Sequence, residues 1–420
     1  MQLRFPGFED EWNQFKLQDI VEINPKSSNL PNEFYYIDLG VINNGRLSDN
    51  IKKIKLSEAP SRAQRLLEIN DILFQTVRPY QKNNFLFLIN NKDKKYVSST
   101  GYAQLRTKSI VSTFFTYYML YAESFIKKVL SLSSGSNYPA VNSKDLSKIM
   151  IYLPSIIEQK NIGSLLFNVD MKIRVLENLF GIYQKFKKYL LQQIFGRLAK
   201  KLQFDFNEEW REVTFKELLI ELNEKTTTNN QHKILSSTKE GIFSQKEYFA
   251  NRNVASKDNT GYKILRKNQI VLSPQNLWMG NINVNTDFEI GIVSPSYKIY
   301  ETTDLVEINY FKHIIKLSRL IYEYKCASEQ GASIVRRNLN KQLFEEIKIN
   351  IPSLKEQEKI ANFLSAVDKK IDLIQTQIDE MEKFKKGLLQ QMFISRINSL
   401  IIITIILISL ESSHVFRFFF

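Results

Sequence analysis

Two stretches of this chain, residues 151–195 and 349–393, are nearly the same sequence, and this repeat constrains the fold more than any other feature. Aligned without gaps, they share 20 of 45 positions at a constant offset of 198 residues, as from Pro154 to Pro352. A long internal repeat indicates that the structural unit itself occurs more than once. The sequence therefore predicts an architecture that is built twice.

Each copy of the repeat is predicted to be a long helix. Apolar residues recur in alternating steps of four and three, the a/d pattern of a coiled coil. They are Ile162, Leu166, Val169, Ile173, Leu176, Phe180 and Tyr183 in the first copy, and Ile360, Leu364, Val367, Ile371, Ile374, Ile378 and Met381 in the second. Two unrelated amphipathic helices would not also share residues outside this seam, such as Gln159 and Lys185. Roughly 38 helical residues would make a rod about 57 Å long.

The start of each helix carries a recognisable signal. Ser155 and Ser353 follow a proline, and each precedes a glutamate, Glu158 or Glu356, by three residues. This is the spacing of a capping box, in which the serine and the glutamate satisfy backbone amides at the first turn. We therefore expect both helices to begin at these serines.

Composition limits the classes of protein to consider. The chain has 420 residues, 43% of them hydrophobic, which allows two to four domains with real cores. A net charge of +14 and a pI near 9.4 favour a polyanionic partner, although a basic protein without one has the same composition. The single cysteine, Cys326, excludes an intramolecular disulfide and fits a reducing compartment. The first residues lack the apolar segment of a signal peptide, so we expect a cytoplasmic protein.

The repeat extends, more weakly, into the segments that precede the helices. Residues 5–24 resemble residues 204–223, and Trp12 and Trp210 in these segments are again 198 residues apart. In both halves, runs rich in Ile, Val, Tyr and Phe and bounded by Asn, Gly, Asp and Pro predict strands. One helix is then predicted in each half, at about residues 111–130 and 309–327. Each globular part is therefore expected to be α+β.

Connectivity predicts how these parts are combined. Only the segment GRLAKKLQ separates the first long helix from the second globular part, so the second helix can pair with the first only by running back along it. The predicted fold class is α+β, with two similar globular domains separated by two long helices that form an antiparallel coiled coil with an internal pseudo-twofold repeat. The predicted segments are a first globular domain (1–150), a first helical repeat (151–197), a second globular domain (198–348), a second helical repeat (349–394) and an apolar C-terminal extension (395–420).

The apolar extension has no counterpart in the first half. Its core, residues 397–410, is too short for a transmembrane helix, which needs about 20 residues. We expect the extension to fray or to pack on the coiled coil, and a membrane anchor is the less favoured alternative.

Motifs of catalysis are missing from the sequence. It contains no GxxxxGK[ST] phosphate loop, no GxGxxG and no GxSxG. His232, His313 and His414 have no second histidine or cysteine at metal-ligand spacing, and Cys326 has no adjacent base. No catalytic residue, metal site or cofactor is therefore predicted. Two copies of a domain without chemistry suggest a protein that holds or recognises something.

Side chains suited to DNA recognition occur at the end of a predicted strand and in a polar loop of each half. Gln and Asn can contact adenine and Arg or Lys can contact guanine in the major groove, while Gly lets the backbone approach a phosphate. The predicted DNA-binding residues are Gln75, Arg78, Tyr80, Lys82, Gly135, Asn137 and Tyr138 in the first half, and Gln275, Asn276, Trp278, Gln330, Arg336 and Arg337 in the second. Gln275 is expected to occupy the place of Gln75, at an offset of 200. An ordinary turn or surface role is the alternative for each of them.

The doubled pattern of these motifs resembles a known family. The FPGFE–W opening, the LPS–EQ–I helix starts and the KFKKGLLQQMF end, over about residues 3–394, are similar to the specificity subunit of type I restriction-modification systems. The resemblance implies two target-recognition domains that each read one half of a split, asymmetric DNA site. It also implies that the paired helices act as a ruler on which methyltransferase subunits dock, and that restriction and translocase subunits join the full complex. The apolar extension departs from the family pattern.

Two other functions fit part of the sequence. One is a non-catalytic coiled-coil scaffold or adaptor whose globular parts bind other proteins. The other is a membrane-tethered adaptor that uses the apolar extension. Salt-dependent DNA binding distinguishes the recognition function from the scaffold, and membrane fractionation tests the tether.

Overall fold

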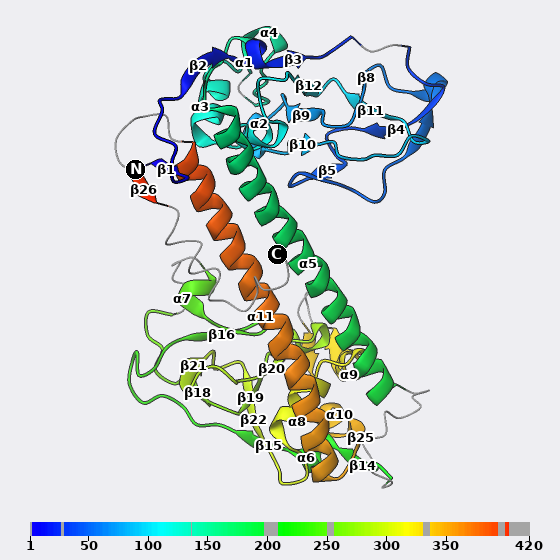
Figure 1. Cartoon of the computed structure of the whole chain (residues 1–420). Coiled ribbons are helices and arrows are strands. Elements are labelled where there is room, and N and C mark those ends of the chain that lie inside the picture. The colour runs from blue at the N-terminus through cyan, green and yellow to red at the C-terminus, as the bar shows by residue number, and fades with distance from the viewer. Residues whose placement is uncertain are drawn as a thin grey trace. The chain divides into compact units, whose positions relative to one another are not determined.

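The structure is a computed structural model, and it describes residues 2–26, 29–135, 137–196, 209–249, 256–330, 337–393 and 400–402 (Figure 1). The chain divides into two compact units, one of residues 1–178 and 375–420 and the other of residues 179–374. The division passes through both long helices, α5 (Ile156–Phe195) and α11 (Leu354–Met392). Each unit therefore contains one globular part and a half of each long helix.

The long helices pack antiparallel within each unit. In the first unit, Ile162 and Leu166 near the start of α5 share a buried cluster with Leu388 and Met392 at the end of α11. In the second unit, the end of α5 packs with the start of α11 in the same manner, through Leu190, Ile194, Ile360, Leu364 and Val367. The predicted antiparallel pairing of two long helices is confirmed.

The elements of the first unit, besides the long helices, are β1 (Gln2–Arg4), β2 (Asn13–Lys16), α1 (Leu17–Ile20), β3 (Val21–Ile23), β4 (Glu33–Ile37), β5 (Ile42–Asn43), β6 (Arg46–Leu47), β7 (Lys53–Lys55), η1 (Leu56–Glu58), β8 (Ala63–Leu66), β9 (Ile72–Gln75), η2 (Pro79–Gln81), β10 (Phe85–Leu86), β11 (Tyr96–Ser99), β12 (Tyr102–Thr107), α2 (Thr113–Met119), α3 (Glu123–Ser131), α4 (Ser143–Ser147), β13 (Met150–Leu153) and β26 (Leu400–Ile402). Those of the second unit are β14 (Arg211–Thr214), α6 (Phe215–Leu218), β15 (Leu219–Leu222), β16 (Leu235–Ser237), β17 (Ile242–Ser244), α7 (Gln245–Tyr248), β18 (Lys263–Arg266), β19 (Ile270–Leu272), η3 (Leu277–Met279), β20 (Ile282–Val284), β21 (Ile290–Val293), β22 (Lys298–Thr302), α8 (Ile308–Ile314), α9 (Ser318–Cys326), β23 (Ser328–Gln330), β24 (Arg337–Leu339), α10 (Lys341–Glu345) and β25 (Lys348–Ile351).

Each globular part contains an inner sheet of its own, and the two sheets have the same arrangement of strands. The strand order is β10–β9–β12–β3 in the first unit and β20–β19–β22–β15 in the second, so equivalent strands occupy equivalent places. The two-stranded pairs β2–β13 and β14–β25 correspond in the same way, each joining a strand near the start of a globular part to the strand before its long helix. The outer strands differ, because the first unit has a sheet of order β7–β4–β11–β8 where the second has the pairs β16–β17 and β18–β21. The α+β class and the repeat are confirmed.

The prediction of a single helix at residues 111–130 and at 309–327 is wrong. Each stretch forms two helices, α2 and α3 in the first unit and α8 and α9 in the second. In the first unit the chain turns between α2 and α3 at Leu120 and Ala122, which are both buried. The turn lets α2 pack on α5, with the rings of Phe114 and Phe167 4.5 Å apart, while α3 covers β9. Tertiary packing on two different surfaces therefore overrides the continuous helical pattern.

The predicted capping box forms in part at Ser155, but not at Ser353, whose Oγ has no hydrogen-bond partner among the described residues. Ser155 Oγ accepts a hydrogen bond from the Glu158 amide at 3.3 Å, but the Glu158 carboxylate binds Arg4 at 2.7 Å. Glu356 likewise accepts from Trp210 Nε1 at 3.3 Å. Both glutamates are buried, and a buried carboxylate needs a cation or a strong donor, so these contacts replace the return bond to the serine.

The glutamine that follows each of these glutamates is also identical in the two copies of the repeat, and it makes the same hydrogen bonds in both units. Gln159 accepts from the Ser112 amide at the start of α2 and donates to the Pro154 carbonyl. Gln357 accepts from the Glu307 amide at the start of α8 and donates to Pro352. One buried amide side chain thus fixes the long helix to α2 in the first unit and to α8 in the second.

The C-terminal extension is described only at Leu400–Ile402, where β26 pairs parallel with β1. The rest of residues 394–420 lies outside the described residues. The predicted domain boundaries, which no comparison tests, stay predictions.

Candidate nucleic-acid interface

Two segments that are far apart in the sequence meet at the end of strand β9. They are the turn of residues 76–84 and the loop of residues 134–141, of which residue 136 is not described. The Arg78 amide donates to the Pro139 carbonyl at 2.8 Å and joins them. We call these two segments the first loop pair. The structure thus brings together the two groups of residues that were predicted for the first half.

Gln75 holds the first loop pair in shape. Its side chain is only 3% exposed. Its amide nitrogen donates to the Val77 carbonyl at 2.7 Å and to Gln81 Oε1 at 2.8 Å, and its oxygen accepts from the Asn83 amide at 3.2 Å. The polar groups of this side chain are therefore used inside the loop, and direct contact between Gln75 and DNA stays a prediction.

An arginine stacked on an exposed tyrosine forms the outer surface of the first loop pair. The guanidinium carbon of Arg78 lies 4.3 Å from the centre of the Tyr138 ring. Tyr138 is 63% exposed and Tyr80 is 49% exposed. Stacking restricts the guanidinium to one plane while leaving its N–H edges available to a partner.

The remaining predicted residues of the first half shape or flank these loops. Lys82 has a left-handed backbone with φ of 54°, and its ammonium donates to the Tyr121 carbonyl at 3.1 Å. Gly135 has φ of 94°, and a Cβ atom there would lie 3.1 Å from the Tyr138 carbonyl oxygen. Glycine is therefore required at this turn. Asn137 is exposed.

The second unit contains a matching loop pair. It consists of the turn of residues 273–281 and the hairpin of residues 328–339, in which β23 and β24 pair antiparallel and residues 331–336 are not described. The Arg337 amide donates to the Gln275 carbonyl at 3.2 Å. We call these segments the second loop pair.

A stacked arginine occurs here too, but the two loops exchange roles. The guanidinium carbon of Arg337, on the hairpin, lies 4.9 Å from the centre of the Trp278 ring, on the strand-end turn. In the first loop pair, the arginine comes from the turn and the ring from the other loop. Each unit therefore has one guanidinium on one aromatic ring, assembled in opposite order.

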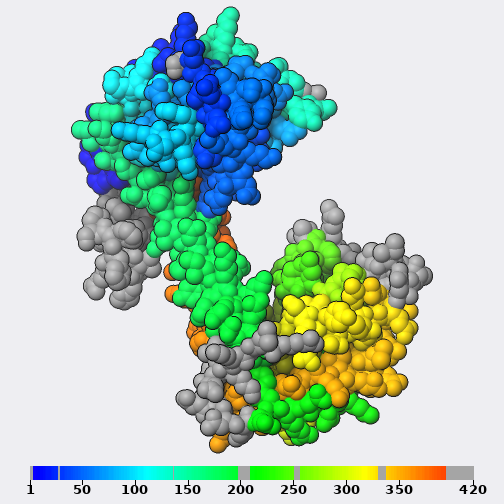
Figure 2. All heavy atoms as spheres, turned by 90° about the vertical axis from the view of Figure 1, so that its right-hand side faces the viewer, coloured from blue at the N-terminus to red at the C-terminus, as the bar shows by residue number. Residues whose placement is uncertain are grey.

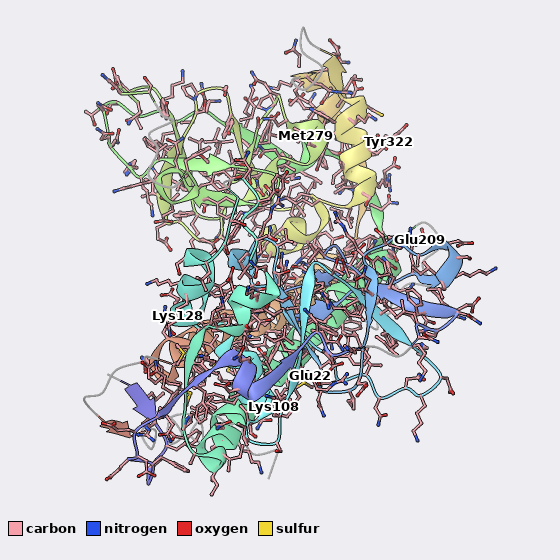
Figure 3. All side chains as sticks on the ribbon, turned by 90° about the horizontal axis from the view of Figure 1, so that it is seen from above. Glu22, Lys108, Lys128, Glu209, Met279 and Tyr322 are labelled. Carbon is pink, nitrogen blue, oxygen red and sulfur yellow. The ribbon has the colours of Figure 1, made fainter. Side chains whose placement is uncertain are left out.

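The other predicted residues of the second half are less defined. Gln275 is exposed, and Asn276 Nδ2 donates to Ser273 Oγ at 3.4 Å. Gln330 is described only by its backbone, which lies opposite Arg337, and Arg336 lies outside the described residues. Met279 of η3, within the turn of this loop pair, and Tyr322 of α9 are partly exposed, and η3 and α9 contact each other (Figure 3).

The match of Gln275 with Gln75 at an offset of 200 is wrong. The 3₁₀ turns η2 and η3 begin at Pro79 and Leu277, an offset of 198, and Lys82 and Gly280 have positive φ at the same offset. Trp278 therefore stands where Tyr80 does, and Gln275 stands in the place of Val77. The match relied on the chance identity of Gln75 and Gln275, whereas the backbone of the two turns aligns at an offset of 198.

Asparagines under the loops were missed by the sequence prediction. Asn84 is fully buried, and its Oδ1 accepts from the Gln75 amide at 3.0 Å. In the second unit, Asn281 and Asn283 bond to the side chain of Ser237 at 2.8 Å each. Lys316 Nζ donates to Asn283 Oδ1 at 2.6 Å, and burial lowers the pKa of Lys316. The only sign of these supporting contacts in the sequence is the presence of asparagines at the end of each turn.

The described part of the chain contains no group of three or more His, Cys, Asp or Glu side chains placed to hold a metal ion. Its helices also include none that is long and apolar enough to cross a membrane.

Comparisons with known proteins match both halves. The family model of the type I restriction modification DNA specificity domain matches residues 9–180 and again residues 207–383. A Methanocaldococcus jannaschii protein, provisionally named type I restriction enzyme MjaX specificity subunit, is 23% identical over 410 residues, which cover 92% of this chain and 94% of that protein. The type I restriction enzyme MjaVIII specificity subunit of the same organism is 25% identical over 339 residues, covering 72% of this chain and 75% of that protein.

Solved structures share the fold. The S subunit of a type I restriction-modification system from M. genitalium superposes with a TM-score of 0.59 at 17% identity, covering 93% of this chain and 98% of that chain. A chain from a structure on complex assembly and conformational transition of the type I R-M system gives a TM-score of 0.52 at 19% identity, covering 93% and 99%.

Proposed function

The chain belongs to the type I restriction-modification DNA specificity family, and from this premise we propose that it reads a split, asymmetric DNA site with its two specificity domains. Specificity subunits are non-catalytic components of these systems, so chemistry on the DNA is left to other subunits. The two loop pairs support the proposal most directly, because each presents a stacked guanidinium beside exposed polar and aromatic side chains.

Asymmetry of the site is proposed because the two loop pairs differ in chemistry. The first presents Tyr80 and Tyr138 around its arginine, whereas the second presents Gln275 and Trp278. Different side chains contact different base edges, so each domain would select its own short half-site. The net charge of +14 adds sequence-independent attraction to the phosphates.

Docking of methyltransferase subunits is proposed on the long helices. In the first unit, α5 leaves Met171 and Val175 exposed, and in the second unit it leaves Ile182, Phe186 and Tyr189 exposed. The side chains of α5, in green, are open to the viewer in Figure 2. Apolar side chains exposed at helical spacing are typical of a surface that another protein covers.

A substitution tests this docking surface. Ile182→Glu with Phe186→Glu is expected to abolish co-purification with the methyltransferase subunit, because two carboxylates would be buried in an apolar contact. The matched control is Lys185→Glu with Lys188→Glu, on exposed positions of the same helix. Retention of the methyltransferase by the first variant would place its docking elsewhere.

The proposal includes the remaining partners and the compartment. Restriction and translocase subunits would join through the complex, no cofactor would be held by this subunit, and the cytoplasm, where the DNA lies, would be its place of action.

The decisive experiment is a map of DNA methylation in cells that carry this chain with its methyltransferase subunit. A split motif that disappears when the chain is deleted is the expected result. If no motif is found although the subunits assemble and the chain shows no salt-dependent DNA shift, the chain is a scaffold for proteins instead.

A further inference from the structure

The two long helices are joined by the same ion pair in both units. In the first unit, Lys385 Nζ of α11 lies 2.5 Å from Asp170 Oδ1 of α5. In the second unit, Lys187 Nζ of α5 lies 2.5 Å from Asp368 Oδ1 of α11. Both aspartates and both lysines stand at identical positions of the sequence repeat.

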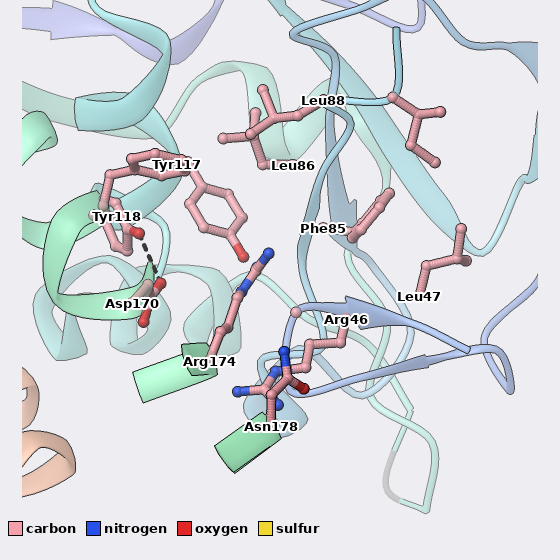
Figure 4. A pocket seen from close by; sticks show the side chains of 13 residues that line it. Arg46, Leu47, Phe85, Leu86, Leu88, Tyr117, Tyr118, Asp170, Arg174 and Asn178 are labelled. Carbon is pink, nitrogen blue, oxygen red and sulfur yellow. Dashed lines mark hydrogen bonds between the residues drawn. The ribbon is translucent and has the colours of Figure 1, made fainter. Parts of the chain in front are cut away.

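Each aspartate also contacts a helix of its own globular part, which is α2 in the first unit and α8 in the second. The Tyr118 hydroxyl of α2 donates to Asp170 Oδ2 at 2.6 Å, as Figure 4 shows. His313 of α8 takes the equivalent place in the second unit, with Nδ1 3.6 Å from Asp368 Oδ2. One carboxylate therefore connects three helices, each at a single point along its length.

Apolar packing does not enclose Asp170 on every side. It lines a cavity of about 380 Å³ together with Arg174, and Leu86 and Leu88 lie across that cavity (Figure 4). The ion pair and the tyrosine hydrogen bond therefore hold the carboxylate in place.

The apolar seam alone does not determine where the helices pair, since its pattern repeats every seven residues. Sliding α11 along α5 by one heptad would put Ile378 or Met392 opposite Asp170 in place of Lys385. A carboxylate would then face an apolar side chain without its cation, which is strongly unfavourable. The ion pair thus discriminates between registers that the seam treats alike.

The second unit gives the same result. A slip of one heptad there would put Phe180 or Ile194 opposite Asp368 in place of Lys187. A polar contact within an apolar seam is a well-attested means by which coiled coils select one register.

We propose that Asp170–Lys385 and Asp368–Lys187 fix the register of α5 and α11 and thereby set the number of base pairs between the two half-sites. These are positioning residues, because they act through the helices without touching DNA. The inference rests on the proposed recognition of a split site.

The test uses the full chain assembled with its methyltransferase subunit. Methylation is measured on a plasmid library in which the two half-sites are separated by different numbers of base pairs. The wild-type chain is expected to methylate one spacer length. Lys385→Met with Lys187→Met is expected to raise methylation by about tenfold at spacers about three base pairs longer or shorter, because a slip of one heptad moves one helix about 10 Å along the other. The half-site sequences are expected to stay unchanged.

Two further variants make the result interpretable. Lys386→Met with Lys188→Met changes the exposed neighbours, which form no ion pair among the described residues, and is expected to keep the single spacer. Reversal of both pairs, by Asp170→Lys and Asp368→Lys together with Lys385→Asp and Lys187→Asp, is expected to restore the single spacer. The reversed variant also decides the matter if the methionine variant does not fold.

Two outcomes would overturn the inference. One is unchanged spacer selectivity in the methionine variant, and the other is a reversed variant that folds but accepts several spacers. A wild-type chain that yields no split motif at all overturns the proposed function itself, which the wild-type arm detects separately.

Discussion

Arg78 and Arg337 each lie against an aromatic ring, and this stacking governs what their guanidinium groups can do. A stacked guanidinium is held in one plane, which suits a bidentate contact with a base edge or a phosphate. Lysine carries the same charge on a flexible stem and has no such plane. Substitution can therefore separate the contribution of charge from that of stacked geometry.

Arg337→Ala is expected to weaken DNA binding and to lower the slope of log affinity against log salt by about one, since one phosphate neutralisation is lost. Arg337→Lys is expected to keep the slope but to reduce the preference for the cognate site. The measurement is a titration of labelled DNA at several salt concentrations. An unchanged slope in Arg337→Ala would remove this arginine from the DNA contact.

His313 makes the second unit sensitive to acid. Burial lowers its pKa to about 4 from 6.5, while Asp368 opposes this shift and Lys187 and Lys312 add to it. The unfolded chain therefore takes up this proton first as the pH falls. The contribution of neutral His313 to the free energy of unfolding is fully present above pH 6.5. It is lost as the pH falls through about 4, and the loss amounts to about 3 kcal/mol at most.

His313→Tyr copies the residue of the first unit, Tyr118, and is expected to remove this part of the pH dependence. Urea unfolding of both proteins between pH 7 and pH 4 measures it, and the difference in stability between them should change with pH. A constant difference over this range would contradict the assignment to His313.

At the scale of elements, one glutamine in each unit fixes the long helix to its globular part. Gln357 Nε2 donates to the carbonyls of Pro352 and Leu305, and its oxygen accepts from the Glu307 amide. The side chain is fully buried. Removing it would leave three buried or partly buried backbone groups without this partner.

Gln357→Leu, which has a similar shape, is expected to destabilise the protein by about 2–4 kcal/mol in urea unfolding because of these lost hydrogen bonds. Gln391→Leu, an exposed glutamine on the same helix, serves as the control and should change stability little. Equal effects of the two substitutions would show that the bonds of Gln357 contribute no more than a surface amide does.

The sequence predicted the elements best where their pattern is local. The heptad seam and the repeat correctly predicted α5 and α11, because period and identity are visible in the residues themselves. The break between α2 and α3, the partners of Glu158 and Glu356 and the different outer sheets were not predicted. They depend on contacts with segments far away in the chain, such as that of Glu158 with Arg4.

Prediction of the candidate site was uneven for the same reason. Composition and turn signals pointed to both loop pairs, and the structure brings their segments together. The inward use of Gln75 and the support from Asn84 arise from burial, which a single sequence does not reveal.

At the scale of the whole molecule, the repeated helices are proposed to determine the distance between half-sites. Insertion of four residues into both α5 and α11, at equivalent positions near the middle, keeps their pairing and lengthens each helix by about 6 Å. We expect the methylated motif to gain one or two base pairs in its spacer, since one base pair spans about 3.4 Å.

Methylation mapping of the insertion variant measures the change. The control is a variant with the same four residues inserted into a loop outside the two long helices. The half-site sequences should stay the same in both. A spacer that keeps its wild-type length in the helix variant would remove the helices from the control of distance.

The exchange of roles between the two loop pairs has a consequence for finding such sites in related chains. Counted along the repeat, Arg78 stands level with Asn276, and Trp278 stands level with Tyr80. A column-by-column alignment of the halves would score the arginine as not conserved, although each unit stacks one on a ring. A search that compares contacts would ask which loop supplies the cation and which supplies the ring. Such a search would detect the similarity of the two sites, which residue-by-residue scoring does not.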